Sequence, residues 1–564
     1  MKRINPLIII AIIAISSALF FLLKPYVKEA NREPINDMIV LYVDGRQLID
    51  KSGIEEYFGE ENRKFIATIA TGALDSDDYN EHIVSIATNP DESGLWLSRP
   101  VYVYVNFDDN NEAYGAAIVE VNDINKLDTT MKLLGDIIAI DGGYFDFKIV
   151  GDTRYFTLEG LAGGYNKSHL ALTIEDNDAS NVLHAALERP LADLSLFEEH
   201  DAALYLDINK FVDNNEKQTA ERIAKLRESL ANSEYDFEVE LFESQIAQLE
   251  EQMLYIGDLR SSLRSDAAII STLDFNAGRI RFTTDFQGVI FSEGLMQEAT
   301  NEHLAYIDEE VVAIANYGIN GKLIAQLISD NIPSNMATML GVGRNEFGVI
   351  LQIGIDALSS MNGDFTVALN DLTGGMHERY NAYRNRRYEQ LEVDGVKAML
   401  MTDVTDSYII DNITRFGGRM FSRTEDGALT MSLGNNIKLY VGQEEDMFYA
   451  GINSQPLLSP NPATSAVWYN DVRGSVGYSV LNINSLLYCS YVDAAYNEWL
   501  STLSSTDAEL ARSVVSSLDY LYHRLDKRCA NELVLVFKDR ETNALKQIVD
   551  QFAPYLILDV DDLF

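Results

Sequence analysis

The sequence is poor in cysteine, and this shortage limits the metal and redox chemistry open to the chain. Cys489 and Cys529 are the only cysteines among 564 residues. Their wide separation matches neither a zinc-ligand motif nor a redox C-x-x-C motif. The two thiols either pair in a disulfide or stay buried and unpaired. Such scarcity is typical of an exported bacterial protein.

Catalytic motifs are also absent from the sequence. The seven histidines are scattered singly, so no H-E-x-x-H pair offers two zinc ligands on one helix face. The chain has no G-x-S-x-G elbow and no Walker phosphate loop. Acidic segments at 75–81, 108–112 and 175–180 lack the central glycine and terminal glutamate of an EF-hand, so we interpret them as solvated turns. We expect no catalytic residue, no metal site and no cofactor.

Basic residues are outnumbered throughout the chain. The sequence holds 44 Lys and Arg against 87 Asp and Glu, a formal net charge of −43. Nucleic acids and anionic membrane surfaces are bound through clustered positive charge, so both are repelled by such a chain. We therefore expect no nucleic-acid partner.

Long apolar runs are limited to one, at the N-terminus. Lys2 and Arg3 precede the apolar segment 7–23, which as a helix would span about 26 Å and barely cross a bilayer. No A-x-A cleavage site follows it. We expect residues 1–35 to form a membrane-anchor helix and a linker that display the protein on the periplasmic face of the inner membrane. The alternative is a cleaved signal peptide and a periplasmic protein.

What the sequence does contain is an internal similarity. Segments 117–135 and 400–418 both read as a short apolar strand, a turn at an aspartate, and an amphipathic helix followed by glycine. We expect the aspartate to cap the helix and the glycine to end it. The residues that match without a gap are Val121 with Val404, Asp123 with Asp406, Asp128 with Asp411, and Gly135 with Gly418.

Other landmarks recur in the same order. The Val/Tyr strand 101–107 and its partner 114–121 predict a hairpin, as does 266–286 with its turn at 276–278. Segment 532–552 is predicted to be the matching closing hairpin of the second half. We predict an α+β fold of two tandem homologous domains with mixed or antiparallel sheets and packed helices. The first domain covers 36–300, with a helical arm at 216–264, and the second covers 301–564.

The layout resembles a known family of anchored or lipidated envelope proteins of Bacteroidales, called domain of unknown function 4836. The resemblance rests on the exported N-terminus, the opening segment MIVLYVDGRQLIDKSGIEEYF, the segment LSSMNGDFTVALND at 358–371 and the closing segment. It covers nearly all of the chain after the anchor. The chain lacks the lipoprotein cysteine that members often carry. The resemblance implies an envelope location and no established activity.

The second half contains an insertion of about 19 residues, at about 373–393, because strand matches shift from an offset of 264 to one of 283. Arginine and tyrosine alternate in this insertion, and both are enriched in binding hot spots. We predict a partner-binding hairpin whose contact residues are Arg379, Tyr380, Tyr383, Arg384, Arg386, Arg387 and Tyr388. The alternative is an exposed elongation whose charges are merely solvated.

These observations favour a non-enzymatic cell-envelope protein with an interaction or scaffolding role. Its expected partner is an envelope protein or a glycan. A second hypothesis is an extracytoplasmic binding protein whose glycan or peptide ligand sits in a cleft between the two repeats. A remote third hypothesis is a hydrolase with an unrecognised site.

Overall fold

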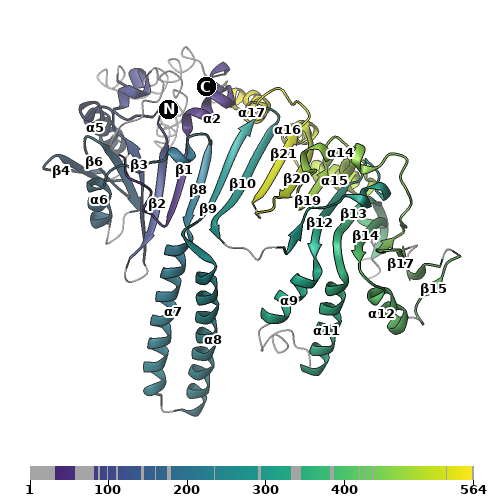
Figure 1. Cartoon of the computed structure of the whole chain (residues 1–564). Coiled ribbons are helices and arrows are strands. Elements are labelled where there is room, and N and C mark those ends of the chain that lie inside the picture. Colours follow the sequence, from purple (N-terminus) through teal and green to yellow (C-terminus); the bar gives the residue numbers. More distant parts are fainter. Residues whose placement is uncertain are drawn as a thin grey trace. The chain divides into compact units, whose positions relative to one another are not determined.

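The computed structural model divides the chain into two compact units. The first unit comprises residues 1–290 and 541–564, and the second comprises 291–540 (Figure 1). The residues that the structure describes are 32–57, 82–86, 89–97, 99–108, 112–140, 145–158, 160–174, 179–233, 235–289, 294–331, 344–381, 386–417, 419–425, 427–434, 437–528 and 530–561. None of the helices in these ranges is long and apolar enough to cross a membrane. The predicted anchor at 7–23 lies outside them.

The first unit is built on one antiparallel sheet. Its strands, in spatial order, are β4 (Phe145–Val150), β5 (Thr153–Leu158), β6 (Leu161–Tyr165), β7 (His169–Ile174), β3 (Ala113–Glu120), β2 (Val101–Phe107), β1 (Ile39–Val43), β8 (Ala202–Asp207), β9 (Leu263–Asn276) and β10 (Arg279–Val289). The predicted hairpins β2–β3 and β9–β10 are both confirmed, the latter turning at Ala277 and Gly278.

Both faces of this sheet carry helices. The helices of the first unit are α2 (Gly45–Ser52), α5 (Ile124–Ile140), α6 (Ala179–Glu188), α7 (Ile208–Ala231), α8 (Asp236–Ser261) and α17 (Ala544–Asp561). Leu183 and Ala186 of α6 belong to a core cluster with Tyr104 on one face of the sheet. Leu127 of α5 belongs to a separate cluster with Leu170, on the other face. Because side chains alternate between the faces of a strand, the two helices cover opposite faces.

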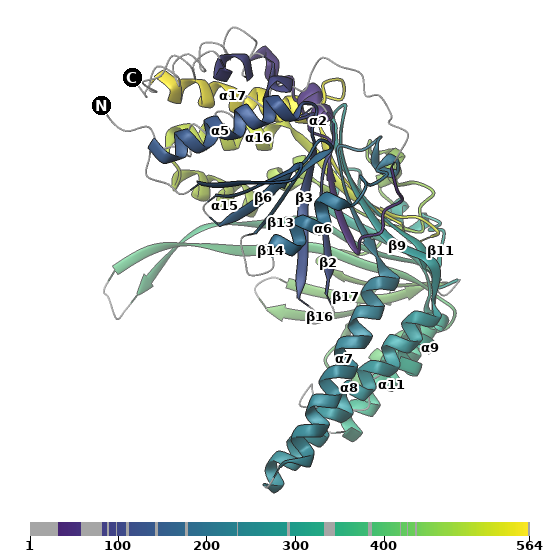
Figure 2. The same ribbon diagram turned by 90° about the vertical axis from the view of Figure 1, so that its left-hand side faces the viewer.

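The predicted helical arm at 216–264 is two helices rather than one. Helices α7 and α8 run side by side away from the sheet (Figures 1 and 2). The chain leaves the helix after α7 and re-enters it at Asp236. Only the base of the pair is anchored in the core, where Val212 and Ile256 pack with Ala267.

The second unit also has one antiparallel sheet. Its strands, in spatial order, are β15 (Ser422–Arg423), β16 (Leu429–Gly434), β17 (Ile437–Glu444), β18 (Met447–Ile452), β14 (Arg386–Val404), β13 (Met361–Asn381), β12 (Ala313–Asn320), β19 (Gly477–Asn482), β20 (Leu518–Leu525) and β21 (Asn531–Phe537), and β11 (Met296–Gln297) pairs with the far end of β12.

Helices and loops complete the second unit. The helices are α9 (Gly321–Asn331), α11 (Arg344–Ser360), α12 (Tyr408–Gly417), α13 (Tyr469–Val472), α14 (Ile483–Tyr488), α15 (Ser490–Ser501) and α16 (Ser505–Ser517). The main core includes Trp468, which precedes α13, and Val472 at the end of α13, and both belong to one cluster with Tyr478 and Tyr520. Both units are therefore α+β, as the sequence predicts.

The two aspartates predicted to cap helices do so. Asp123 accepts the backbone N–H of Asn125 at 2.9 Å, and Asp406 accepts that of Tyr408 at 2.9 Å. The glycine prediction is wrong at Gly135, which lies inside α5. A Cβ there would lie 2.6 Å from the ring of Phe145, so this glycine permits close packing rather than ending the helix. Gly418 lies outside the described residues.

The predicted closing hairpin at 532–552 is also wrong. Strand β21 pairs with the preceding β20, and the chain then forms α17, whose first turn is capped by Asn543 through the backbone N–H of Leu545 at 2.9 Å. Helix α17 belongs to the first unit, where Lys546 pairs with Glu56 at 2.7 Å. The second compact unit therefore ends at 540, earlier than the domain 301–564 that the sequence suggests.

Candidate functional site

A pocket of about 610 Å³ opens in the second unit. Its walls come from the loop before β12, the middle of β13, the loop that carries Trp468, the start of α14, and the start of β20. Such a volume is in the range of small-ligand sites. The lining residues are Asp308, Glu309, Glu310, Val311, Val312, Asn370, Asp371, Ser465, Ala466, Val467, Trp468, Asn482, Asn484, Ser485, Tyr488, Cys489, Asp519 and Tyr520.

The lining is strongly acidic and contains no lysine or arginine. Two of its five carboxylates have a cation nearby: Asp371 lies 3.9 Å from Lys397, and Asp519 lies 2.5 Å from Arg540. The other three, Asp308, Glu309 and Glu310, have no ion-pair partner among the described residues. The pocket therefore carries an uncompensated negative charge.

A β-bulge aims Asn370 into this acidic region. The register of β13 against β14 shifts between Leu369 and Asp371, and Asn370 is the extra residue. A bulge turns one side chain away from the regular alternation of the strand. The Oδ1 atom of Asn370 is buried and accepts no hydrogen bond from the described residues.

Aromatic residues line the other side. Trp468 is only 2% exposed and packs beside Tyr478, with ring centroids 6.4 Å apart, and its Nε1 atom is buried without an acceptor among the described residues. Tyr488 is 88% exposed, so its ring is available to a ligand. The unsatisfied atoms of Asn370 and Trp468 are closed to solvent, so they are a cost to the folded state rather than contact points for a ligand.

The pocket also contains a thiol. Cys489 is buried, and its Sγ donates to the carbonyl of Ser485 at 3.5 Å. Burial raises the pKa of this thiol above its ordinary value, so it is not activated as a nucleophile. Cys489 is a free thiol in the structure, and Cys529 lies outside the described residues.

The corresponding place in the first unit is closed by the chain itself. Asn106 corresponds to Asn370 in strand register. Asn106 follows Val105, which pairs with the first residue of β1, and Asn370 follows Leu369, which pairs with the first residue of β12. Its Oδ1 accepts the N–H of Met38 at 2.8 Å, and its Nδ2 donates to Asp37 at 2.8 Å.

An arginine completes this closed corner. Arg189 binds both carboxylate oxygens of Asp37, at 2.9 and 2.6 Å, and its guanidinium lies 4.4 Å above the ring of Tyr104. Burial raises the pKa of Tyr104 to about 12, so the ring stays neutral beneath the cation. We call Asp37, Tyr104, Asn106 and Arg189 the first-unit corner.

The predicted partner-binding residues lie on a long hairpin of the second unit, β13–β14. Arg379 pairs with Tyr388 and Tyr380 with Arg387 across the two strands. Tyr380 and Tyr388 are exposed, by 61% and 46%. Arg386 is placed by its backbone alone, and Tyr383 and Arg384 lie outside the described residues. The structure thus brings four of the seven side chains onto neighbouring positions of one hairpin.

The hairpin is not a basic surface, however. Arg379 forms an ion pair with Glu392, Arg387 pairs with Glu378 at 3.1 Å, and His377 lies 3.0 Å from Asp394. The arginine holds the pKa of Glu392 below its ordinary value. Between residues 374 and 394 the four arginines are matched by four carboxylates. Net positive charge therefore gives no support to the predicted partner-binding hairpin, which stays a prediction that rests on its exposed tyrosines.

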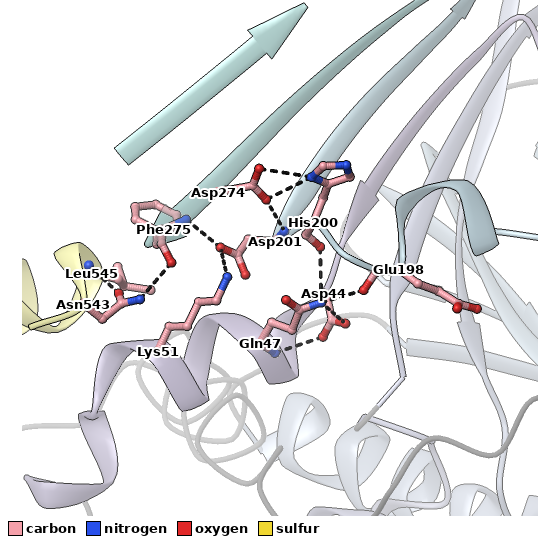
Figure 3. Close-up of polar contacts among 10 residues, drawn as sticks. All are labelled: Asp44, Gln47, Lys51, Glu198, His200, Asp201, Asp274, Phe275, Asn543 and Leu545. Atoms are coloured by element: carbon pink, nitrogen blue, oxygen red, sulfur yellow. Dashed lines mark hydrogen bonds and ion pairs between the residues drawn. The ribbon is translucent and has the colours of Figure 1, made fainter. Parts of the chain in front are cut away.

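A polar cluster in the first unit serves the fold rather than a ligand. Figure 3 shows Asp201 between strand and helix: Oδ2 accepts from Lys51 at 2.7 Å and from the N–H of Phe275 at 2.7 Å. His200 lies 3.1 Å from Asp274 in the same view. Lys51 joins α2 to the loop before β8, and Asp201 and His200 join that loop to the end of β9, so we interpret the cluster as an anchor for α2.

A second cluster imitates a catalytic triad without access for a substrate. The Nδ1 atom of His303 lies 2.8 Å from the hydroxyl of Thr366, and Nε2 lies 3.0 Å from Asp403. The Thr366 hydroxyl, however, donates to Asn316 at 2.8 Å, and His303 and Thr366 are both buried. A nucleophile must reach its substrate, so this cluster gives no support to hydrolysis.

Sequence reasoning missed the pocket. Its clearest local signal was the acidic run at 308–310 directly before the strand of β12. The other walls come from segments as far along the chain as Tyr520, which periodicity does not connect to the 308–310 run. Among the described residues, no group of three or more His, Cys, Asp or Glu is placed to hold a metal ion. No family model, curated protein or solved structure matches the chain.

Proposed function

We propose that this chain is a non-enzymatic cell-envelope protein that binds a ligand in the pocket of its second unit. The observation that carries the proposal is the cavity of about 610 Å³, whose lining includes three carboxylates without an ion-pair partner among the described residues. A ligand that supplies positive charge or hydrogen-bond donors compensates them. Binding rather than catalysis is favoured because the only thiol in the lining has a raised pKa and no histidine lines the pocket.

The proposal includes a duplicated origin for the two units. Their sheets have the same order of pairing, from β4 to β10 and from β15 to β21. Asp207 begins the helix after β8 by accepting the N–H of Lys210 at 3.0 Å, and Asn482 begins the helix after β19 by accepting that of Ser485 at 3.1 Å. The resemblance to domain of unknown function 4836, the periplasmic location and the anchor at 7–23 belong to the same proposal and rest on the sequence.

The binding function is tested by blocking the pocket at its mouth. Val467 lines the pocket and is 70% exposed, so Val467→Trp fills the opening without disturbing the core. Leu457→Trp is the matched control, because Leu457 is 74% exposed and lies outside the lining.

The readout is the melting temperature of the full chain with a panel of cationic, neutral and anionic peptides and oligosaccharides. A ligand at about 100 times its Kd adds about 2.7 kcal/mol to the free energy of unfolding. We expect at least one class to stabilise the wild type and the control but not Val467→Trp. Identical responses of all three proteins would refute binding in this pocket.

A second candidate function is partner binding through the β13–β14 hairpin, favoured by its exposed tyrosines. The test is a pull-down from native envelopes with the full chain and with a chain lacking 375–390. Tyr380→Ala together with Tyr388→Ala is the finer variant, because both rings are exposed and their loss leaves the ion pairs in place. Loss of one captured protein in both variants supports the function, and an unchanged capture contradicts it.

A further inference from the structure

The pocket of the second unit has the charge of a cation-binding site. Asp308, Glu309 and Glu310 stand together on one loop, and none of them has an ion-pair partner among the described residues. A concave surface of one charge sign concentrates field lines and attracts the opposite charge. An anionic or neutral ligand would leave these carboxylates uncompensated on binding.

The carboxylates are not arranged around a point. A calcium ion requires six to eight oxygens at about 2.3–2.6 Å, converging on one position. No group of three or more acidic, histidine or cysteine side chains among the described residues meets this condition. A larger cation whose charge is spread over several N–H groups suits separated carboxylates better. Guanidinium presents five such donors in a plane.

The molecule already pairs guanidinium with tyrosine and carboxylate in two places. In the first-unit corner, Arg189 lies over Tyr104 and binds Asp37. At the edge of the pocket, Arg540 lies 5.1 Å above Tyr520 and pairs with Asp519. Stacking of a cation on an aromatic face contributes about 0.5–2 kcal/mol, more where water is excluded.

The free groups of the pocket repeat this arrangement without its cation. Tyr488 offers an exposed ring, and Glu309 and Glu310 offer carboxylates without an ion-pair partner among the described residues. Asp308 adds negative charge, although its oxygens already accept from the hydroxyl of Ser459 at 3.0 Å and the N–H of Glu310 at 3.1 Å. A guanidinium is the side-chain group of arginine, so an arginine residue of a peptide supplies the missing cation.

We infer that the pocket binds an arginine residue of a peptide, with its guanidinium between the 308–310 carboxylates and the ring of Tyr488. This inference rests on the proposed binding function and names its ligand class. The bound arginine in the second unit then plays the role that Arg189 plays in the first.

The test compares two amides that differ in charge alone. L-argininamide carries the guanidinium, and L-citrullinamide carries a neutral group of nearly the same shape. Both are titrated into the full chain by calorimetry, with tryptophan fluorescence as a second readout. We expect argininamide to bind at least about tenfold more tightly, and its affinity to fall between about 50 and 500 mM salt as screening increases.

The variants locate the cation. Glu309→Gln together with Glu310→Gln removes two charges and keeps the side-chain shape, and we expect about a tenfold loss of argininamide affinity. Glu509→Gln on α16 is the matched control, because Glu509 is exposed and lies outside the lining. The melting temperature of each variant without ligand confirms that it folds.

Different failures have different meanings. Equal affinity for the two amides, with both lost in Val467→Trp, would overturn the cation requirement and leave the proposed binding function standing. Argininamide binding that neither the glutamine pair nor Val467→Trp weakens would overturn the assignment to this pocket. If argininamide does not bind, the inference is overturned. The melting-temperature panel of peptides and oligosaccharides then tests the binding function by itself. A tighter response to CaCl₂ that EDTA reverses and the glutamine pair abolishes would assign the carboxylates to a metal ion instead.

Discussion

The first-unit corner and the second-unit pocket occupy the same place in two sheets of the same pairing order, yet one is closed and the other is open. In the corner, Arg189 neutralises the buried Asp37, and both polar groups of Asn106 form hydrogen bonds within the chain, with Met38 and Asp37. In the pocket, Asn370 keeps a free acceptor beside unpaired carboxylates. The difference teaches that the same pairing order leaves this position filled by an arginine of the chain in one unit and open in the other, which is the place where we propose that a ligand binds.

The largest effect is expected from removing that cation. Arg189→Ala leaves the carboxylate of Asp37, which is 2% exposed, buried without a counter-ion. Breaking a buried ion pair costs about 3–5 kcal/mol. Native-state hydrogen exchange of the full chain should show this loss at the amides of β1 and β8, and not in the second unit.

The control for this variant is Arg227→Ala, which breaks an exposed pair with Glu250. Exposed ion pairs contribute about 0–1 kcal/mol, so little change is expected. If Arg189→Ala were no more destabilising than Arg227→Ala, the closed corner would not be held by its arginine.

One substitution made in both units sharpens the comparison. Asn106→Leu leaves the N–H of Met38 without its acceptor and removes a donor from Asp37, which should cost about 1–3 kcal/mol. Asn370→Leu removes an acceptor that was already unsatisfied, so we expect a change near zero or a gain of up to about 1 kcal/mol. Urea unfolding of the full chain, followed separately in each unit by hydrogen exchange, measures both. Equal losses at the two positions would show that Asn370 is satisfied within the fold.

Acid should weaken the first unit through His169. This side chain is 2% exposed; Nε2 lies 2.8 Å from the carbonyl of Ala186, and Nδ1 is buried without a hydrogen bond. Burial lowers the pKa of His169 below its ordinary value. The neutral ring therefore stabilises the folded state fully above about pH 6.5, and this contribution is lost as the pH falls through the lowered pKa.

We expect exchange of the amides of α6 and β7 to accelerate from pH 6.5 downward, after correction for intrinsic rates. His169→Gln keeps the contact to Ala186 and should flatten this dependence, whereas His184→Gln, on the exposed side of α6, should leave it unchanged. A flat profile in the wild type would contradict the prediction.

The smallest effect is expected on the exposed hairpin. Arg379→Ala breaks an ion pair with Glu392 that lies at the surface, unlike the pair of Arg189 and Asp37. Water and salt screen such a pair, so the melting temperature should stay within measurement error. A clear drop in melting temperature would mean that the hairpin is part of the cooperative fold rather than an appendage.

Local patterns in the sequence predict much of this fold. Alternation of valine and tyrosine at 101–107 predicts β2, and Asp123 and Asp406 predict helix starts, because these signals need only neighbouring residues. Segment 532–552 misleads because a strand and a helix follow each other without a clear break, and Gly135 misleads because its packing partner is a strand ten residues away. The closing helix of the first unit comes from the end of the chain, which no local pattern reveals.

The candidate site is less predictable than the fold. Its walls meet only after β12, β13, β19 and β20 pair, and the free acceptor of Asn370 depends on a bulge. The change of offset from 264 to 283 reflects the longer β13–β14 hairpin, and it does not reveal the one-residue bulge at Asn370.

The placement of α17 has a consequence for how the chain matures. Tyr57 donates to Asp550 at 3.0 Å, and Asn543 donates to the carbonyl of Phe275 at 2.8 Å, so the first unit is completed by residues made after the whole second unit. Synthesis proceeds from the N-terminus, at about 5–20 residues per second. The second unit therefore has all of its residues first, while the earlier-made unit must wait, with its docking surface for α17 uncovered, until residues 544–561 have been made.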